Sequence, residues 1–158
     1  MAILVESGRA AVAAAIKAQP IHLAWGEGEV VWDNAKPAEQ TSETTVKNEL
    51  GRRIVSYSSF VTPDSAGQVI VSQGRFKEVT TPTKYLYLRF QYDFPDAQQA
   101  TIRALGIFVG TQVNAGVSGL DYMPIGQYSG GELLVLEYID KLVRSSSIRQ
   151  QFEFVIQF

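Results

Sequence analysis

The sequence contains no cysteine and only one histidine, His22, among its 158 residues. Without cysteine the chain forms no disulfide and offers no thiolate for catalysis or metal binding. Zinc sites usually need several histidine or cysteine ligands, so we expect no metal centre of that kind. His22 stands in an apolar stretch, and no Gly-x-Ser-x-Gly turn is present to offer a serine nucleophile. We interpret His22 as a hydrogen-bonded strand residue and predict no catalytic residue, cofactor or metal.

Charge of one sign is not concentrated anywhere in the sequence. The formal net charge is -2 and the lysines and arginines are scattered, so the basic stripe of a nucleic-acid-binding protein is missing. No segment approaches the ~20 apolar residues that cross a bilayer. Glu6 and Arg9 interrupt the apolar start, which does not fit a signal peptide. We therefore expect no nucleic acid or membrane as partner, and synthesis in a bacterial cytoplasm.

Neither a nucleotide-binding loop nor a paired-carboxylate site has a supporting motif. The glycines of Gly26-Glu27-Gly28 lack the third glycine and the following helix of a dinucleotide fingerprint, and no Walker-type loop occurs. Glu27 and Glu29 alternate about Gly28, and we interpret them as solvated carboxylates rather than as the acid and base of a glycosidase. No heptad series or internal repeat indicates a fibre shaft.

The length fits one domain, expected over residues 1–158. Residues 8–18 are rich in alanine and predict a helix with Ser7 as N-cap, which Pro20 closes. A second short helical turn is expected from Thr41 or Ser42 through Leu50, with Gly51 as its stop. Residues 21–33 are read as two short strands joined at the glycines. The predicted fold class is α+β, a mainly antiparallel sheet with one or two short helices packed on it.

Alternation of apolar residues predicts most strands. Residues 85–94 are the clearest case, because Leu86, Leu88, Phe90, Tyr92 and Phe94 fall on one face. Further strands are expected at 54–61, 69–71, 102–109, 133–139 and 148–158. In the last of these Phe152, Phe154, Ile156 and Phe158 share a face, which indicates a strand docked in its own sheet or in that of a neighbour.

Residues 111–131 read as a long exposed loop. This segment is rich in glycine and carries Tyr122, Met123 and Tyr128. Loops longer than ~15 residues are usually functional or disordered, so we expect it to be a contact element. Aromatic side chains here, and at Trp25 and Trp32, suit either a protein interface or stacking on a sugar ring.

Four short motifs in order resemble the N-terminal attachment domain of bacteriophage tail-fibre and tail-collar proteins. They are the Ala-rich segment 8–16, Ala24-Trp25-Gly26-Glu27-Gly28, Asn48-Glu49-Leu50-Gly51-Arg52-Arg53, and Leu105-Gly106-Ile107-Phe108. The likeness covers residues 1–110, and the loop 111–131 and C-terminal strands 132–158 lie outside it. Glu49 and Arg52 are expected to form a surface pair, and Arg53 to reach a partner's carboxylate.

The resemblance implies a structural protein of the virion, not an enzyme. Because the sequence ends at a strand instead of running on into a shaft, we expect a separate tail or baseplate component that attaches or positions tail fibres. Its expected partners are other tail and baseplate proteins and the tail fibre, within a symmetric homo-oligomer. Alternatives are a head-to-tail or tail-terminator connector, a glycan-binding module, and a tail-borne cell-wall hydrolase. The expected interface residues are Trp25, Trp32, Arg52, Arg53, Tyr122, Tyr128, Phe152, Phe154 and Phe158.

Overall fold

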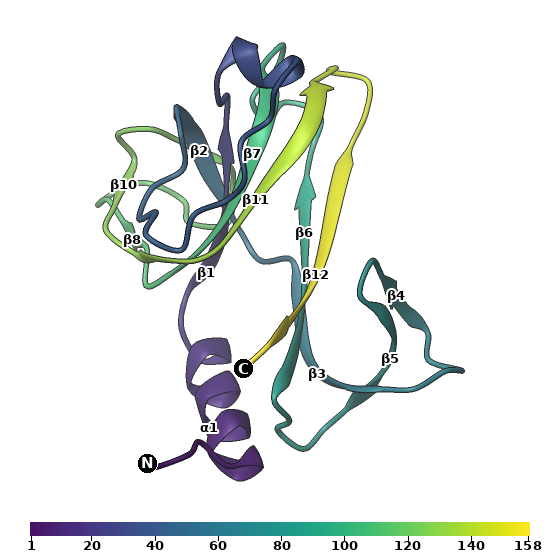
Figure 1. Cartoon of the computed structure of the whole chain (residues 1–158). Coiled ribbons are helices and arrows are strands. Elements are labelled where there is room, and N and C mark those ends of the chain that lie inside the picture. Colours follow the sequence, from purple (N-terminus) through teal and green to yellow (C-terminus); the bar gives the residue numbers. More distant parts are fainter. The chain divides into compact units, whose positions relative to one another are not determined.

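The computed structural model describes residues 1–158, which form two compact units (Figure 1). Unit 1 is built from Met1–Gln19, Val55–Phe90 and Gln151–Phe158, and unit 2 from Pro20–Ile54 and Gln91–Gln150. The single domain expected over residues 1–158 stays a prediction. The strand pairs with a defined register are all antiparallel, and one α-helix is present. The mainly antiparallel β-structure is therefore confirmed.

Unit 1 contains the helix and a five-stranded sheet. The helix is α1 (Glu6–Lys17). The sheet has the order β12-β6-β3-β5-β4. Its strands are β3 (Tyr57–Pro63), β4 (Val69–Val71), β5 (Gly74–Val79), β6 (Tyr85–Tyr92, whose last two residues belong to unit 2) and β12 (Gln150–Gln157, whose first residue belongs to unit 2). A core cluster of Val61, Val69, Phe76, Tyr87 and Val155 packs between these strands.

Unit 2 contains a second five-stranded sheet, with the order β11-β7-β1-β2-β9, and a two-stranded ribbon of β8 and β10. Its strands are β1 (Ile21–Gly26), β2 (Glu49–Ile54), β7 (Thr101–Val109), β8 (Gln112–Val113), β9 (Met123–Pro124), β10 (Tyr128–Ser129) and β11 (Glu132–Val143). A 3-10 turn, η1 (Val30–Asp33), follows β1. Strand β7 is buried along nearly its whole length, as its continuous apolar run predicts.

The helix prediction is right in kind and slightly displaced. Helix α1 begins at Glu6, with Val5 rather than Ser7 at the N-cap position, and Val5 makes no side-chain cap bond. The Glu6 carboxylate pairs with Lys84 of unit 1, and Lys17 lies over the ring of Phe60. The two ends of α1 are thus tied to residues of unit 1 by side-chain contacts.

Two expectations for residues 21–54 are wrong. Residues 30–33 form the 3-10 turn η1 and not a second strand. Residues 41–48 contain no helix, and β2 begins directly after them at Glu49. Local propensity for a helix is overridden because Val46 of this segment is buried, with its methyl carbons directly over Gly26 and Gly106. A Cβ on Gly106 would lie only 2.2 Å from Val46 Cγ2, so glycine is needed for this close approach.

Candidate protein-interaction site

Arg52 is the centre of a buried polar network in unit 2, not half of a surface pair. Its Nε donates to Glu49 Oε1 at 2.6 Å, and its Nη1 donates to Thr111 Oγ1 at 2.8 Å and to the Gly130 carbonyl at 2.9 Å. The guanidinium also lies 3.5 Å from the centre of the Phe108 ring. A planar group with five donors suits this arrangement. The expected pair of Glu49 and Arg52 is therefore confirmed, but its place on the surface is wrong, because Arg52 is only 6% exposed.

The network fastens both ends of the 111–131 segment. The Tyr128 hydroxyl donates to Glu49 Oε1 at 2.5 Å, and burial together with this bond raises the pKa of Tyr128. Tyr122 lies across Gly51 of β2, where an added Cβ would be 2.4 Å from its hydroxyl oxygen. Burial raises the pKa of Tyr122 to about 12. The two tyrosines expected to face a partner thus hold the segment to its own sheet.

The 111–131 segment is more ordered than a free loop. It contains β8, β9 and β10, and the Asn114 amide group donates to the Gly126 carbonyl at 2.8 Å. Met123 is fully buried. The apolar side chains that face solvent are instead Leu120 (74% exposed), Ile125 (58%) and Val113 (37%). The segment expected to be an irregular loop is therefore held in place by short strands and hydrogen bonds. The apolar side chains that it exposes are not Tyr122, Met123 and Tyr128, which the sequence suggests.

Arg53 reaches carboxylates within its own chain. Its two terminal nitrogens pair with Asp93 and Asp96, at 2.9 Å and 2.5 Å. Arg144 closes the same region by donating to the backbone carbonyls of both aspartates. Arg53 was expected to bind a partner's carboxylate, but in the structure its guanidinium is engaged by these two aspartates of its own chain. Such a network orders the turn between β6 and β7.

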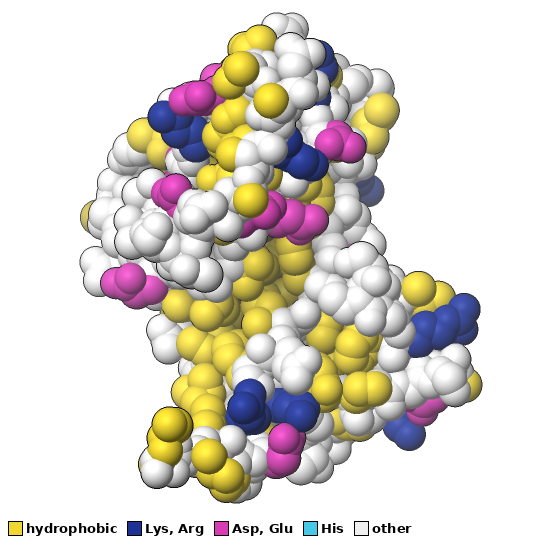
Figure 2. All heavy atoms as spheres, viewed as in Figure 1, with side chains coloured by type: hydrophobic (Ala, Val, Ile, Leu, Met, Phe, Trp, Pro, Cys, Tyr) yellow, Lys and Arg dark blue, Asp and Glu magenta, His cyan; other side chains and the backbone are white.

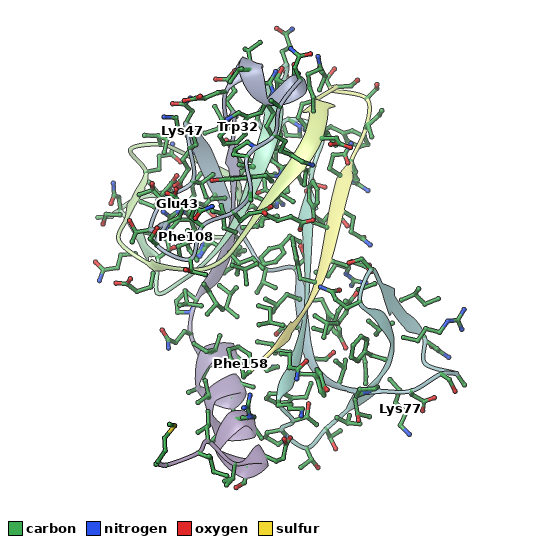
Figure 3. The ribbon with its side chains drawn as sticks, viewed as in Figure 1. Trp32, Glu43, Lys47, Lys77, Phe108 and Phe158 are labelled. Carbon is green, nitrogen blue, oxygen red and sulfur yellow. The ribbon has the colours of Figure 1, made fainter.

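Trp25 and Trp32 have different surroundings. Trp25 is fully buried and stacks on Tyr92, with ring centres 3.6 Å apart. Trp32 is half-buried in η1 and packs against Tyr138 of β11, with ring centres 4.6 Å apart. Figure 3 shows the side chains of Trp32, Glu43 and Lys47 in the same region of unit 2. Of the two tryptophans, only Trp32 is partly exposed to solvent.

The 34–48 segment covers part of the sheet of unit 2. Lys36 pairs with Asp140 at 3.0 Å, and the Tyr138 amide donates to the Glu39 carboxylate at 2.7 Å. Hollows of about 300 and 360 Å³ open beside this segment, one over β11 and one over Trp32 and Tyr138. Sequence reasoning missed this surface, since the segment reads only as a loop and a helical turn.

The C-terminal aromatics of unit 1 are held in the sheet. Phe154 is buried and Phe152 and Phe158 are half-buried on or next to β12. The Phe158 amide donates to the Lys84 carbonyl, and its own carbonyl accepts a bond from Arg9 of α1 at 2.8 Å. Figure 3 shows Phe158 beside α1. The docked strand is confirmed within the chain, while an interface role for these residues stays a prediction.

Other exposed groups lie on unit 1. The stretch before α1 exposes Met1, Ile3, Leu4 and Val5, and Figure 2 shows hydrophobic side chains where the N-terminus lies. The β4–β5 hairpin exposes Ile70, Arg75 and Lys77. Basic side chains are visible on this hairpin at the right of the same view (Figure 2). The sequence pattern predicts a strand at residues 69–71, but neither β5 nor the exposure of this hairpin.

The ionisable groups of the chain form no reactive constellation. His22 is buried and neither ring nitrogen has a hydrogen-bond partner, so the expected satisfied histidine is wrong. Burial and the neighbouring Arg52 lower the pKa of His22 to about 4. No group of three or more histidine, cysteine or acidic residues is placed to hold a metal ion. Glu27 is exposed and Glu29 pairs with Lys47 at 3.0 Å, as suits solvated carboxylates. No helix has the length and apolar character to cross a membrane.

Comparison with known proteins identifies the family. No curated protein matches the sequence. The family model described as "Baseplate wedge 3 tail fiber network component" matches residues 1–158, the whole chain. The four motifs that resemble tail-fibre attachment domains agree with that match. The chain therefore belongs to the family of baseplate wedge 3 tail fiber network components, structural proteins of the phage tail and baseplate with a role in tail-fibre attachment.

Proposed function

We propose that this protein holds tail fibres in the baseplate through the 111–131 segment. The observation that carries this proposal is the Arg52 network, which fixes both ends of that segment while Leu120 and Ile125 remain exposed. A segment already ordered in the free protein loses little conformational entropy on binding, which favours a tight contact. Exposed aliphatic side chains on a rigid support are suitable anchors for a partner surface.

The proposed role is structural and not enzymatic. The only imidazole, that of His22, is buried between strands and has a lowered pKa, which suits packing more than proton transfer. Glu29 is neutralised by Lys47 instead of facing a second carboxylate. We further propose that the protein is made in the host cytoplasm, acts within a symmetric homo-oligomer, and binds neither nucleic acid nor membrane.

The proposal is tested by co-purification of the full chain with tail fibres of the same phage. The variant carrying Leu120→Asp and Ile125→Asp is expected to lose most of the bound fibre, because it places charges in an apolar contact. Ile70→Asp of β4, an equally exposed isoleucine of unit 1, is the matched control and is expected to bind fibres normally. Unchanged fibre binding by the double variant, with its melting temperature unaltered, would overturn the assignment of this segment.

A further inference from the structure

The two units carry opposite net charges. Unit 1 contains six lysines and arginines against four acids, while unit 2 contains eight against twelve. Every lysine of unit 2 pairs with a carboxylate, and its arginines bond to carboxylates or backbone carbonyls. Six acids of unit 2 have no ion pair: Glu27, Glu39, Glu43, Asp121, Glu132 and Glu137. The surplus negative charge of unit 2 is therefore available to a cationic partner.

Two of these acids, Glu39 and Glu43, line a groove. The two hollows beside the 34–48 segment share Gln40 and Glu43 in their linings, so they adjoin. Residues 133–136 of β11 line one hollow, and Trp32 and Tyr138 line the other. We call this surface the acidic groove. It combines the apolar side chains of β11 with the unpaired carboxylate of Glu43, which both hollows share. Lys47 also lines it, and its charge is paired with Glu29.

The acidic groove has the chemistry that binds a guanidinium group. The Glu39 carboxylate accepts a hydrogen bond from the Tyr138 amide at 2.7 Å, and Glu43 lines both hollows. Burial, and then the charges of Glu43 and Glu39, raise the pKa of Tyr138. Trp32 offers a half-buried ring beside Tyr138. Arginine stacks on aromatic faces and pairs with carboxylates at the same time, which a lysine does less well. An exposed arginine on a protruding element is thus the partner that fits.

The chain itself carries such an element. Ile70 of β4 lies directly opposite Arg75 of β5, so their side chains project from the same face of the hairpin. Both are exposed, and Arg75 has no ion pair. Lys77, two residues further along β5, is 3.5 Å from Asp64 and more than half exposed. We call residues 69–79 the basic hairpin.

We propose that the basic hairpin of one copy docks in the acidic groove of a second copy, with Arg75 facing Glu43 and Ile70 against the apolar wall of β11. Since the two surfaces differ, the contact is head-to-tail and repeats from copy to copy, to give a closed ring or an open row. This contact would build the homo-oligomer that is part of the proposed function, and to that extent it rests on that function. It can fail while fibre attachment through Leu120 and Ile125 holds.

Sedimentation velocity of the full chain over a wide range of concentrations and salt tests the docking. We expect the wild type to associate as concentration rises and to dissociate as salt rises. Arg75→Glu and Glu43→Arg should each weaken association about tenfold or more. Lys17→Glu on α1 and Asp121→Arg in the 111–131 segment reverse the same charges elsewhere in their units, and should leave association unchanged.

The decisive variant combines both reversals in one chain. Arg75→Glu with Glu43→Arg restores opposite charges on hairpin and groove, so it should associate nearly as well as the wild type. A wild type that is monomeric at all concentrations, or a combined variant no better than the single ones, would overturn the proposal. Co-purified fibre measured on the same variants separates the two proposals, because Arg75→Glu should still bind fibres and the variant carrying Leu120→Asp and Ile125→Asp should still self-associate.

Discussion

His22 should make the stability of unit 2 depend on pH. Its pKa is about 4 in the folded chain against 6.5 for an ordinary histidine, so the folded state keeps the ring neutral where the unfolded chain protonates it. The contribution to stability is therefore intact above pH ~6.5 and is lost as the pH falls toward ~4. A pKa difference of about 2.5 at about 1.4 kcal/mol per unit corresponds to a loss of about 3 kcal/mol.

Urea unfolding at pH 7, 5.5 and 4 measures this loss, because both tryptophans lie in unit 2 with His22 and their fluorescence reports its unfolding. His22→Leu removes the titrating ring and two buried nitrogens without partners. We expect the variant to be at least as stable as the wild type at pH 7. Its advantage should grow by about 3 kcal/mol at pH 4. The reasoning is refuted if both proteins lose the same free energy of unfolding over this range, since the carboxylates common to both would then explain all of it.

Two further predictions concern packing and the Arg52 network. Gly106→Ala should lower the free energy of unfolding by about 1 to 3 kcal/mol, as measured by urea unfolding, because the new methyl group displaces Val46. Val46→Ala in the same chain should recover part of that loss. If the losses of the two single variants simply add in the double variant, the close contact is contradicted. Arg52→Ala should cost about 3 to 5 kcal/mol and raise amide hydrogen exchange at both ends of the 111–131 segment. Arg149→Ala, which removes an exposed arginine of unit 2, is its control, and equal exchange in the two variants would argue against the network.

Strands with clear alternation are predictable from the sequence, because the face of a strand follows from local pattern alone. Leu86, Leu88, Phe90 and Tyr92 of β6 are all buried, as expected. Phe94 is 41% exposed because β6 ends at Tyr92 and the chain turns there. The continuous apolar run of β7 was equally informative, since only a strand covered on both faces tolerates it.

The candidate site was predictable only in outline. Tyr122 and Tyr128 were expected at a partner interface from the composition of their segment, and Arg52 from its motif, and that role stays a prediction. What the sequence did not indicate is that all three hold the 111–131 segment to β2 or to its own ends. Burial of this kind depends on contacts between residues far apart in the sequence. Such contacts leave no local periodic pattern that a single sequence could reveal. The acidic groove was missed for the same reason, since the place of the 34–48 segment depends on Val46 meeting glycines from two other strands.

During translation, unit 2 is completed before unit 1. All of unit 2 has been translated once Gln150 is made, whereas unit 1 still lacks Gln151–Phe158. Until β12 emerges from the ribosome, β6 remains an unpaired edge that other chains can join. Premature termination near residue 150 would therefore leave unit 2 whole and make unit 1 prone to aggregate, so damage confined to eight residues would remove the protein from assembly altogether.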